Sequence, residues 1–281
     1  MSRLRYLNKT IRAVTFDVTG TLLQHPKPIA QAYYECAEWA RLKDCPSVEE
    51  LRPAFKAAYK STLLEFPCFR HSRNQWWRTM LARTLEHTGR NYSAADFERF
   101  YLRVYQYYGS HAGYAVYDEV APLLRYLRSQ DIVLGVVSNT PLRTIESTLP
   151  MLGLHGHFDF FVCAEQFGGF KPDAPIFAEA VSKAQFWYKK YSADVAGIAP
   201  HAHIHPEHVL HIGDSLEADF RGARAAGFQA ALLARSGSVQ YNDWLVGPAE
   251  GRTSSEEQRR HTYRCLGDLR RDLHSEEQAW M

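Results

Sequence analysis

Long apolar runs are missing from this sequence. The longest candidates, such as residues 132–137, have the length of a β-strand, whereas a membrane-spanning helix needs about 20 apolar residues. The N-terminal segment carries Arg3, Arg5 and Lys9 but no apolar stretch of the kind that a secretory signal contains. We therefore expect a protein that is neither embedded in a membrane nor secreted.

Paired cysteines are missing as well. The five cysteines lie far apart and no C-x-x-C pair occurs, so neither a disulfide framework nor a zinc site is indicated. A reducing compartment fits this pattern, and we expect the cytoplasm, with the nucleus and the mitochondrion left open.

The formal net charge is +2, and no basic stretch is interleaved with aromatic residues, so we expect no nucleic-acid partner.

What the sequence does contain begins with a short stretch around Asp17. Residues 11–16 predict a buried strand, and Asp17 follows it directly, ahead of the turn residues Thr19 and Gly20. Open parallel sheets build ligand sites beyond the carboxyl ends of their strands, so this carboxylate is well located for chemistry. Gly20 lets the chain turn back closely beneath whatever Asp17 holds. An Asp in this place is as often a plain turn residue, so both interpretations stay open at this point.

Residues 25–117 have a different character, with dense aromatic residues and apolar residues at helical spacing. These stripes predict four or more helices, and Ile29, Tyr33 and Ala37 form the first of them. The simplest interpretation is the core of a helical subdomain. Because it is inserted directly after the strand that carries Asp17, the subdomain could also act as a lid that excludes water from a site.

Strands and helices alternate again in the rest of the chain. An apolar run, residues 132–137, predicts a strand buried on both faces, and it ends in Ser138 and Asn139. A second predicted strand, residues 158–163, is followed by two glycines and then by Lys171. A Ser-Asn pair is often a turn or a helix cap, and an isolated Lys is by default solvated, so each signal is weak alone.

A pair of acidic residues after the last but one predicted strand is the most specific signal. The strand of residues 208–213 ends in Asp214, Asp219 follows five residues later, and a helix rich in Ala and Gly comes next. Two carboxylates so close together would repel each other unless a cation joined them. Oxygen ligands at the tip of a strand suit Mg²⁺, so we expect a Mg²⁺ site here.

In order and spacing, these signals resemble the four motifs of the haloacid dehalogenase-like (HAD) hydrolases. The matching positions are Asp17, Ser138, Lys171, Asp214 and Asp219. The resemblance implies that Asp17 is the nucleophile and a Mg²⁺ ligand, that Ser138 hydrogen-bonds the transferring phosphoryl group, and that Lys171 balances charge. It also implies that Asp214 is a Mg²⁺ ligand and that Asp219 is a supporting carboxylate of the metal site.

The same resemblance implies an α/β fold, in which a Rossmann-like parallel-sheet core carries an inserted all-helical cap of the C1 type. The expected limits are residues 11–24 and 118–235 for the core, 25–117 for the cap and 236–281 for a polar C-terminal tail.

Within the core, residues 185–207 look like an insertion. Its alternating histidines could ligate a transition metal if they lay on a strand, but prolines at 200 and 206 favour a loop.

One position departs from the phosphatases of this family, because Thr19 stands where they carry a second Asp. That Asp protonates the leaving group and later activates water. Thr19 can do neither, although its backbone carbonyl can still bind Mg²⁺. P-type ATPases, which also carry Thr there, resemble this case in keeping a long-lived aspartyl phosphate. Gly20 and Asn139 are expected to contact the substrate.

Thr19 in place of the second Asp, together with Gln75-Trp76-Trp77 in the expected cap, indicates one subgroup within the HAD family. The chain is similar to the HAD subgroup of haloacid dehalogenase-like hydrolase domain-containing protein 3 and rhythmically expressed gene 2 protein, whose members also lack the second Asp. No biochemical role follows from this similarity.

Three functions fit these residues. The first is a slow Mg²⁺-dependent phosphatase for a small phosphate ester with a good leaving group. The second is an enzyme that holds or passes on the phosphoryl group, and the third is a non-catalytic module that senses a metabolite or binds a partner. Dehalogenation comes fourth, because it dispenses with Mg²⁺ and would leave Asp214 and Asp219 without a cation between them. The sequence leaves the substrate and the oligomeric state open.

Overall fold

The computed structural model describes residues 5–6, 9–66, 73–193, 203–235 and 260–278. Contacts within the chain divide it into two compact units. The first unit comprises Met1–Leu23, Val116–Thr140 and Gly153–Met281, and the second comprises Gln24–Ala115 and Pro141–Leu152. In the described residues, every helix falls short of the length and apolarity that crossing a membrane requires.

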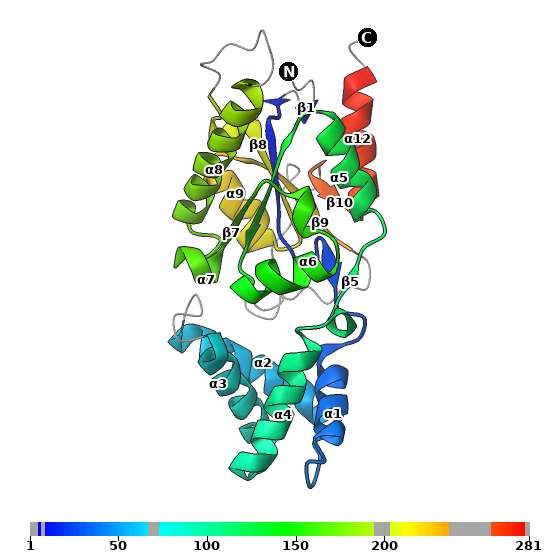
Figure 1. Cartoon of the computed structure of the whole chain (residues 1–281), viewed down its shortest axis with the longest axis vertical. Coiled ribbons are helices and arrows are strands. Elements are labelled where there is room, and N and C mark those ends of the chain that lie inside the picture. The colour runs from blue at the N-terminus through cyan, green and yellow to red at the C-terminus, as the bar shows by residue number, and fades with distance from the viewer. Residues whose placement is uncertain (1–4, 7–8, 67–72, 194–202, 236–259, 279–281) are drawn as a thin grey trace. The chain divides into compact units, whose positions relative to one another are not determined.

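A six-stranded parallel sheet forms the centre of the first unit (Figure 1). Its strand order is β10-β9-β8-β3-β6-β7. Most of its residues are buried, so the strands are continuous apolar runs, as parallel strands covered on both faces are. This arrangement confirms the predicted α/β core. The strands are β3 (Ala13–Phe16), β6 (Val133–Ser138), β7 (Phe160–Cys163), β8 (Val209–Gly213), β9 (Gln229–Leu233) and β10 (Thr262–Tyr263).

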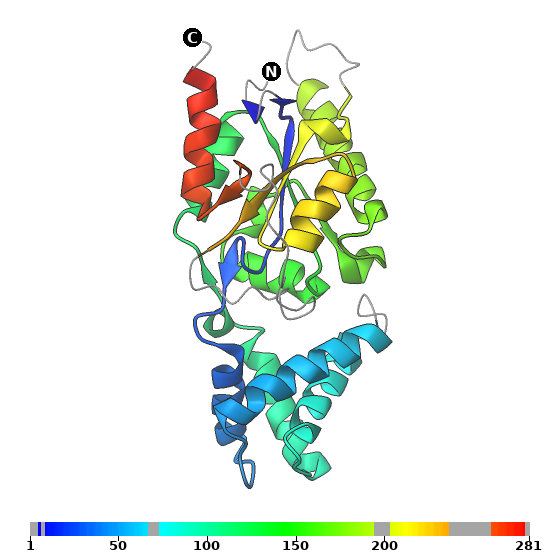
Figure 2. The same ribbon diagram turned by 180° about the vertical axis from the view of Figure 1, so that it is seen from behind.

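Helices cover both faces of this sheet (Figures 1 and 2). Helices α8 (Ala174–Ala193) and α9 (Gly222–Ala225) lie on one face, and α5 (Val120–Ser129) and α12 (Leu266–Gln278) lie on the other. Phe177 of α8 is fully buried in a cluster that the sheet and this helix share. Burying a side chain of that size stabilises the fold by about 1.5–3 kcal/mol.

Short elements complete the first unit and its border. The N-terminal strands β1 (Arg5–Tyr6) and β2 (Lys9–Thr10) pair in antiparallel fashion. Where the chain first leaves the unit and first re-enters it, β4 (Leu23–Gln24) and β5 (Ala115–Val116) form a two-stranded sheet. The remaining short elements are α7 (Ala164–Phe167), η4 (His155–His157), η5 (Pro206–His208) and the π-helical η6 (Leu216–Arg221).

The second unit is all-helical, and its four main helices are α1 (Ile29–Trp39), α2 (Val48–Glu65), α3 (Arg73–Glu86) and α4 (Ala94–Tyr107). Short helical segments η2 (His111–Gly113), η3 (Thr144–Thr148) and α6 (Leu149–Met151) belong to it as well. Tyr33 lies edge-on to Phe55 and Phe100, with ring centroids 5.4 and 6.2 Å away. The aromatic stripes of the sequence are therefore core, as the simplest interpretation predicts.

Helix α8 extends into the segment that the sequence analysis treats as an insertion. Helix α8 continues to Ala193, so residues 185–193 of that segment are helical. Tyr188 is buried with the core cluster of this helix, and the Tyr191 hydroxyl donates a hydrogen bond to Asp159. Positions 184, 188 and 191 thus form one helical face, which the surrounding lysines concealed.

The C-terminal segment, which the sequence predicts to be a polar tail, contains a strand and a helix in its described residues. Strand β10 extends the sheet in parallel with β9, and Thr262 lies opposite Leu232. On α12, Leu266, Leu269 and Leu273 are buried. Three leucines at a spacing of three and four residues suffice to bury one face of a helix, although the segment as a whole is polar.

Candidate active and metal site

Asp17 directly follows β3, the strand between β8 and β6. Its Oδ1 atom accepts two hydrogen bonds, from Ser138 Oγ at 2.9 Å and from Lys171 Nζ at 2.8 Å. Ser138 ends β6, so the strand order itself places this hydroxyl beside the carboxylate. Burial raises the pKa of Asp17 to about 6, although Lys171 acts in the opposite direction.

Lys171 lies between two carboxylates. Its Nζ atom is 2.8 Å from Asp17 Oδ1 and 2.5 Å from Asp219 Oδ1, and its side chain is buried. Burial alone would lower the pKa of this ammonium, but the two carboxylates outweigh burial and raise the pKa above its ordinary value. Lys171 is therefore charged at neutral pH and holds the two acids on either side of one cation.

Asn139 fixes the backbone of Lys171. The Asn139 Nδ2 atom donates to the Lys171 carbonyl at 2.9 Å, and Asn139 Oδ1 accepts from the Lys171 amide at 2.8 Å. Because Asn139 follows directly after β6, this two-point contact ties the lysine to the same strand that supplies Ser138. The expected contact of Asn139 with a substrate stays a prediction.

Both oxygens of Asp219 are occupied by donors. Oδ1 accepts from Lys171 Nζ and faces His211 Nε2 at 3.0 Å, and Oδ2 accepts from the Ser215 amide at 2.9 Å. A Cβ on Gly213 would come within 2.1 Å of Asp219 Cγ, so only glycine leaves room for this carboxylate. Burial by itself would raise the pKa of Asp219, but Lys171 and His211 hold it well below its usual value.

Asp214 has the opposite surroundings. It follows β8 and is buried, and its Oδ1 atom has no hydrogen-bond partner. Burial, with Asp17 and Asp219 nearby, raises the pKa of Asp214 well above its ordinary value. Gly20 packs directly against this carboxylate, since a Cβ there would lie 2.2 Å from Asp214 Oδ2, and its φ of +85° also favours glycine. The predicted close turn at Gly20 is present, and what it approaches is Asp214.

Thr19 lies in this same turn. Its backbone pairs with Leu23 in an isolated bridge, and its side chain is half-buried. Arg235 holds the turn from outside, because its Nε atom donates to the Gly20 carbonyl and its Nη2 atom to the Thr21 carbonyl, each at 3.1 Å. The backbone that follows Asp17 is thus fixed by side-chain contacts.

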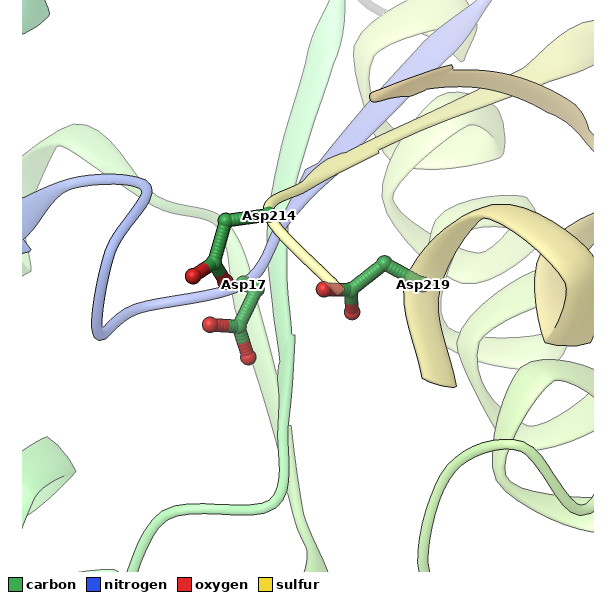
Figure 3. Close-up of side chains that lie close together, drawn as sticks. All are labelled: Asp17, Asp214 and Asp219. Atoms are coloured by element: carbon green, nitrogen blue, oxygen red, sulfur yellow. The ribbon is translucent and has the colours of Figure 1, made fainter. Parts of the chain in front are cut away.

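The three carboxylates fit a divalent cation. One oxygen from each of Asp17, Asp214 and Asp219 lies within 4.8 Å of the others, and this is the group of metal-ligand type found among the described residues. Figure 3 shows the Asp17 and Asp214 carboxylates next to each other, with Asp219 reaching toward them from η6. When all three are ionised, Lys171 leaves two negative charges uncompensated. A buried oxygen without a partner and an excess of two charges together suit Mg²⁺.

Two residues of this cluster, His211 and Thr15, were not singled out from the sequence. His211, in the middle of β8, is fully buried and lies between Asp219 and Thr15 of β3. The available signal was an ionisable side chain inside a strand that is otherwise apolar, since such a group needs partners when it is buried. Its partners depend on strand register, which the sequence alone does not supply.

The histidines of the expected insertion are not gathered into a metal site in the described residues. His203 and His205 have ring centroids 6.5 Å apart, and the His208 Nδ1 atom accepts the His205 backbone amide. Residues 203–205 form a loop ahead of η5, as the prolines predict. His201 lies outside the described residues.

Together, the fold and the site define a class of α/β hydrolases that gather a lysine and several aspartates at the carboxyl ends of a parallel sheet. The chain belongs to the haloacid dehalogenase-like hydrolase family, which matches residues 11–227. It is 31% identical over 228 residues to haloacid dehalogenase-like hydrolase domain-containing protein 3 of Bos taurus, across 80% of this chain and 82% of that protein. It is 27% identical over 232 residues to rhythmically expressed gene 2 protein of Drosophila melanogaster, across 79% and 82% of the two chains. The predicted family and subgroup are confirmed.

Solved structures show the same fold. The magnesium-bound HAD-hydrolase YfnB of Bacillus subtilis matches with a TM-score of 0.63 at 20% identity, across 95% of this chain and all of that one. A 2-haloacid dehalogenase of Pseudomonas syringae pv. Tomato DC3000 matches with a TM-score of 0.54 at 25% identity, across 95% and 99% of the two chains. The chain therefore shares its fold with these solved structures over nearly its whole length.

Proposed function

We propose that this protein is a slow Mg²⁺-dependent phosphatase for small phosphate esters, and that it acts through a phosphoryl group carried on Asp17. One observation carries the proposal. Lys171 lies between Asp17 and Asp219, while Asp214 keeps a buried oxygen without a partner on the other side of Asp17. This asymmetry supplies a fixed ammonium on one side of the attacking carboxylate and a place for a metal ion on the other.

Asp17, Asp214 and the backbone carbonyl of Thr19 would hold the Mg²⁺ ion, with Asp219 as the supporting carboxylate. When bound, the ion supplies positive charge next to the phosphoryl oxygens. It would also offset the burial, and the repulsion between carboxylates, that raise the pKa of Asp17 and Asp214 in the ion-free protein.

In the first step, an oxygen of Asp17 forms a bond to phosphorus, and the bond between phosphorus and the ester oxygen breaks. The leaving oxygen keeps the electron pair. Asp17 Oδ1 accepts hydrogen bonds from Ser138 and Lys171, so this side chain is held in one orientation before the reaction. Lys171 stabilises the charge that develops on the phosphoryl oxygens.

In the second step, water attacks phosphorus, its proton passes to solvent, and the bond between Asp17 and phosphorus breaks to release phosphate. Thr19 limits both steps, because an aliphatic hydroxyl neither protonates the leaving oxygen nor activates water at neutral pH. General acid–base help of this kind is worth about 10²–10⁴-fold in rate. Substrates whose leaving oxygen is a stable anion need the least help, so aryl and acyl phosphates are the favoured class.

The proposal is tested with aryl phosphates whose leaving groups span a range of pKa. We expect Mg²⁺-dependent turnover that rises steeply as the pKa of the leaving group falls, and that disappears in the Asp17→Asn variant. The absence of Mg²⁺-dependent turnover across the whole panel would overturn the proposal and favour a non-catalytic module that binds a metabolite or a partner.

A second candidate is favoured by the same residue. Because Thr19 supplies no base for the second step, the aspartyl phosphate could outlast the first step, and the protein would then hold or pass on the phosphoryl group. With acetyl phosphate, this function predicts a burst of one equivalent of acetate and a stable adduct on Asp17 in mass spectrometry. Rapid steady turnover without a burst contradicts it.

The variant Thr19→Asp separates a complete site from a decayed one. Restoring a carboxyl group two residues after Asp17 is expected to raise turnover by about 10²–10⁴-fold if the proton donor is all that is missing. Thr19→Asn is the matched control, since its amide has similar size and no ionisable proton. Equal turnover in the two variants would mean that the rest of the site no longer supports catalysis.

A further inference from the structure

Arg235 joins three segments of the first unit at the edge of the sheet where the candidate site lies. It comes two residues after β9, and its side chain is only 8% exposed. Its Nε atom donates to the Gly20 carbonyl and its Nη2 atom to the Thr21 carbonyl, each at 3.1 Å, while Nη1 donates to Glu119 Oε1. Every nitrogen of the guanidinium therefore has an acceptor.

Two residues of the segment that follows β5 hold this guanidinium in place. Its central carbon lies 3.6 Å from the centre of the Tyr117 ring, so the face of the ring covers the cation. Glu119 supplies the opposite charge that a buried guanidinium needs. The Tyr117 amide also donates to the Leu22 carbonyl at 3.2 Å. The orientation of Arg235 is thus fixed by the protein itself.

The turn after β3 contains three successive peptide groups, and Arg235 holds two of them through the carbonyls of Gly20 and Thr21. The Gly20 amide donates to the Leu23 carbonyl at 2.7 Å. A trans peptide group is planar, and its N–H and C=O point in opposite directions. The Thr19 carbonyl belongs to the same peptide group as the Gly20 amide, so it is directed away from Leu23.

This turn contributes to the proposed Mg²⁺ site in two ways. The Thr19 carbonyl is a proposed ligand, and Gly20 packs so closely against Asp214 that a Cβ there would lie 2.2 Å from Asp214 Oδ2. Mg²⁺ demands nearly ideal octahedral geometry from its oxygen ligands. A turn that shifts would therefore bind the ion less tightly, even with every ligand residue still present.

We propose that Arg235 is a positioning residue for the metal ion, which holds the backbone of Thr19 and Gly20 against Asp214 and thereby sets the affinity of the site for Mg²⁺. This inference deepens the proposed function and rests on it for the identity of the ion and its ligands. Arg235 acts through backbone carbonyls of the turn, so its contribution is separate from that of the ligands.

The variant Arg235→Met tests the proposal through the binding of Mg²⁺ alone, measured by isothermal titration calorimetry. Removing an outer partner of a metal site typically costs about 10–100-fold in metal affinity, so we expect the Kd for Mg²⁺ to rise by about that factor. Arg235→Lys should raise the Kd less, because an ammonium still donates to a carbonyl but lacks the planar fork. A wild-type Kd in Arg235→Met would overturn the proposal.

Arg128→Met is the matched control for a loss of stability alone. Arg128 donates to both oxygens of Asp159 at 3.0 Å and to the His157 carbonyl at 2.8 Å. Asp159 directly precedes β7 and accepts from the Leu134 amide near the start of β6, so these contacts lie at the opposite edge of the sheet from the site. Both variants should lower the free energy of unfolding, but only Arg235→Met should weaken Mg²⁺ binding. Equal rises of the Kd in the two variants would contradict the inference.

Hydrogen exchange of the ion-free protein gives a readout that needs neither Mg²⁺ nor turnover. The amides of residues 21–23 all donate to the Val18 carbonyl, at 2.8 to 3.3 Å. If Arg235 holds this turn, these amides should exchange faster in Arg235→Met, relative to the amides of β6, than they do in the wild-type protein. Unchanged relative exchange in the turn would also overturn the proposal.

The inference and the proposed function can fail separately. A wild-type protein that binds Mg²⁺ but has no turnover refutes the proposed function, and the Kd of Arg235→Met still decides the inference. Wild-type turnover together with an unchanged Kd in Arg235→Met refutes the inference alone. A wild-type protein that binds no Mg²⁺ refutes both.

Discussion

Asp214 and Asp219 are five residues apart, equally buried and on opposite sides of the same site, yet their surroundings are opposite. Asp219 receives donors on both oxygens, and its pKa is lowered. Asp214 has one oxygen without a partner, and its pKa is raised. The difference teaches that the surrounding protein satisfies one carboxylate of the site in full and leaves the other with an oxygen that a cation could occupy.

The two sides also use glycine differently. Gly213 makes room for a carboxylate that the protein itself satisfies, and Gly20 makes room for one that it does not. The close approach of Gly20 leaves no room for a side chain at that position beside Asp214. A cation bound to this buried carboxylate would interact with it more strongly than in water.

Of the variants that test this comparison, Lys171→Met should have the largest effect on stability and turnover. It removes the cation between Asp17 and Asp219 and leaves uncompensated buried charge, which costs about 3–5 kcal/mol in the free energy of unfolding. We expect turnover to fall by about 10²–10³-fold as well. Urea denaturation and aryl phosphate assays measure the two effects.

Lys183→Met is the control for that variant. Lys183 is half-buried on α8, where it forms an ion pair with Glu179 at 3.7 Å and donates to the Phe161 carbonyl at 2.9 Å. A solvent-accessible ion pair contributes about 0–1 kcal/mol and a hydrogen bond about 0.5–1.5 kcal/mol. Similar losses of stability in the two lysine variants would mean that the Asp219 side is not the finished structure described above.

Replacing each aspartate by asparagine sharpens the comparison, because the two changes should have opposite signs in EDTA. Asp219→Asn loses a satisfied charge and should destabilise the protein by about 2–4 kcal/mol. Asp214→Asn removes an unpaired buried charge and should stabilise it by about 1–3 kcal/mol. Thermal and urea denaturation of both variants check the signs, and two changes of the same sign would refute the distinction.

Bound Mg²⁺ should give the Asp214 carboxylate the partner that it lacks, so that neither Asp214 nor Asp219 is left unsatisfied. Because the ion binds the folded protein, it should raise the free energy of unfolding of the wild-type protein, by about 2.7 kcal/mol at 100 times the Kd. Asp214→Asn should abolish this gain. Melting curves with and without Mg²⁺ measure it, and a gain that persists in Asp214→Asn would place the ion elsewhere.

The smallest effect is on the pH dependence of stability. In EDTA, the pKa of Asp17 is raised from 3.8 to about 6 on folding, so the native protein binds more protons than the unfolded chain between these values. The free energy of unfolding should therefore fall as the pH rises from about 4 to about 6. Asp17→Asn should reduce this slope without abolishing it, because the raised pKa of Asp214 contributes in the same direction, and saturating Mg²⁺ should weaken it further. A rise in stability over the same range of the EDTA profile would contradict the described environment of Asp17.

The positions of three site residues were predictable, because each ends or directly follows a strand. Asp17, Ser138 and Asp214 lie directly at or after the ends of β3, β6 and β8, and parallel strands bring their carboxyl ends to one edge. The roles of the partners were not predictable in the same way. Which aspartate is satisfied depends on His211, and that contact depends on the register of β8 against β3.

Composition gave little sign of the structure at two places. Residues 185–193 are rich in lysine, and residues 260–278 are polar overall, yet both segments belong to the first unit and contribute buried apolar residues to it. In each case a few apolar residues at helical spacing decide the outcome, since one buried stripe is enough to fix a helix. Averages over a whole segment conceal such a stripe.

Strand β10 comes late in the sequence, so the sheet is completed only near the end of chain synthesis. The outer edge of β9 finds its partner in Thr262 and Tyr263, which leave the ribosome after nearly all of the other core residues. Until then, the backbone N–H and C=O groups along that edge are open to other chains. A chain truncated before residue 260 would keep every residue of the candidate site and still expose a bare, apolar strand as a template for aggregation.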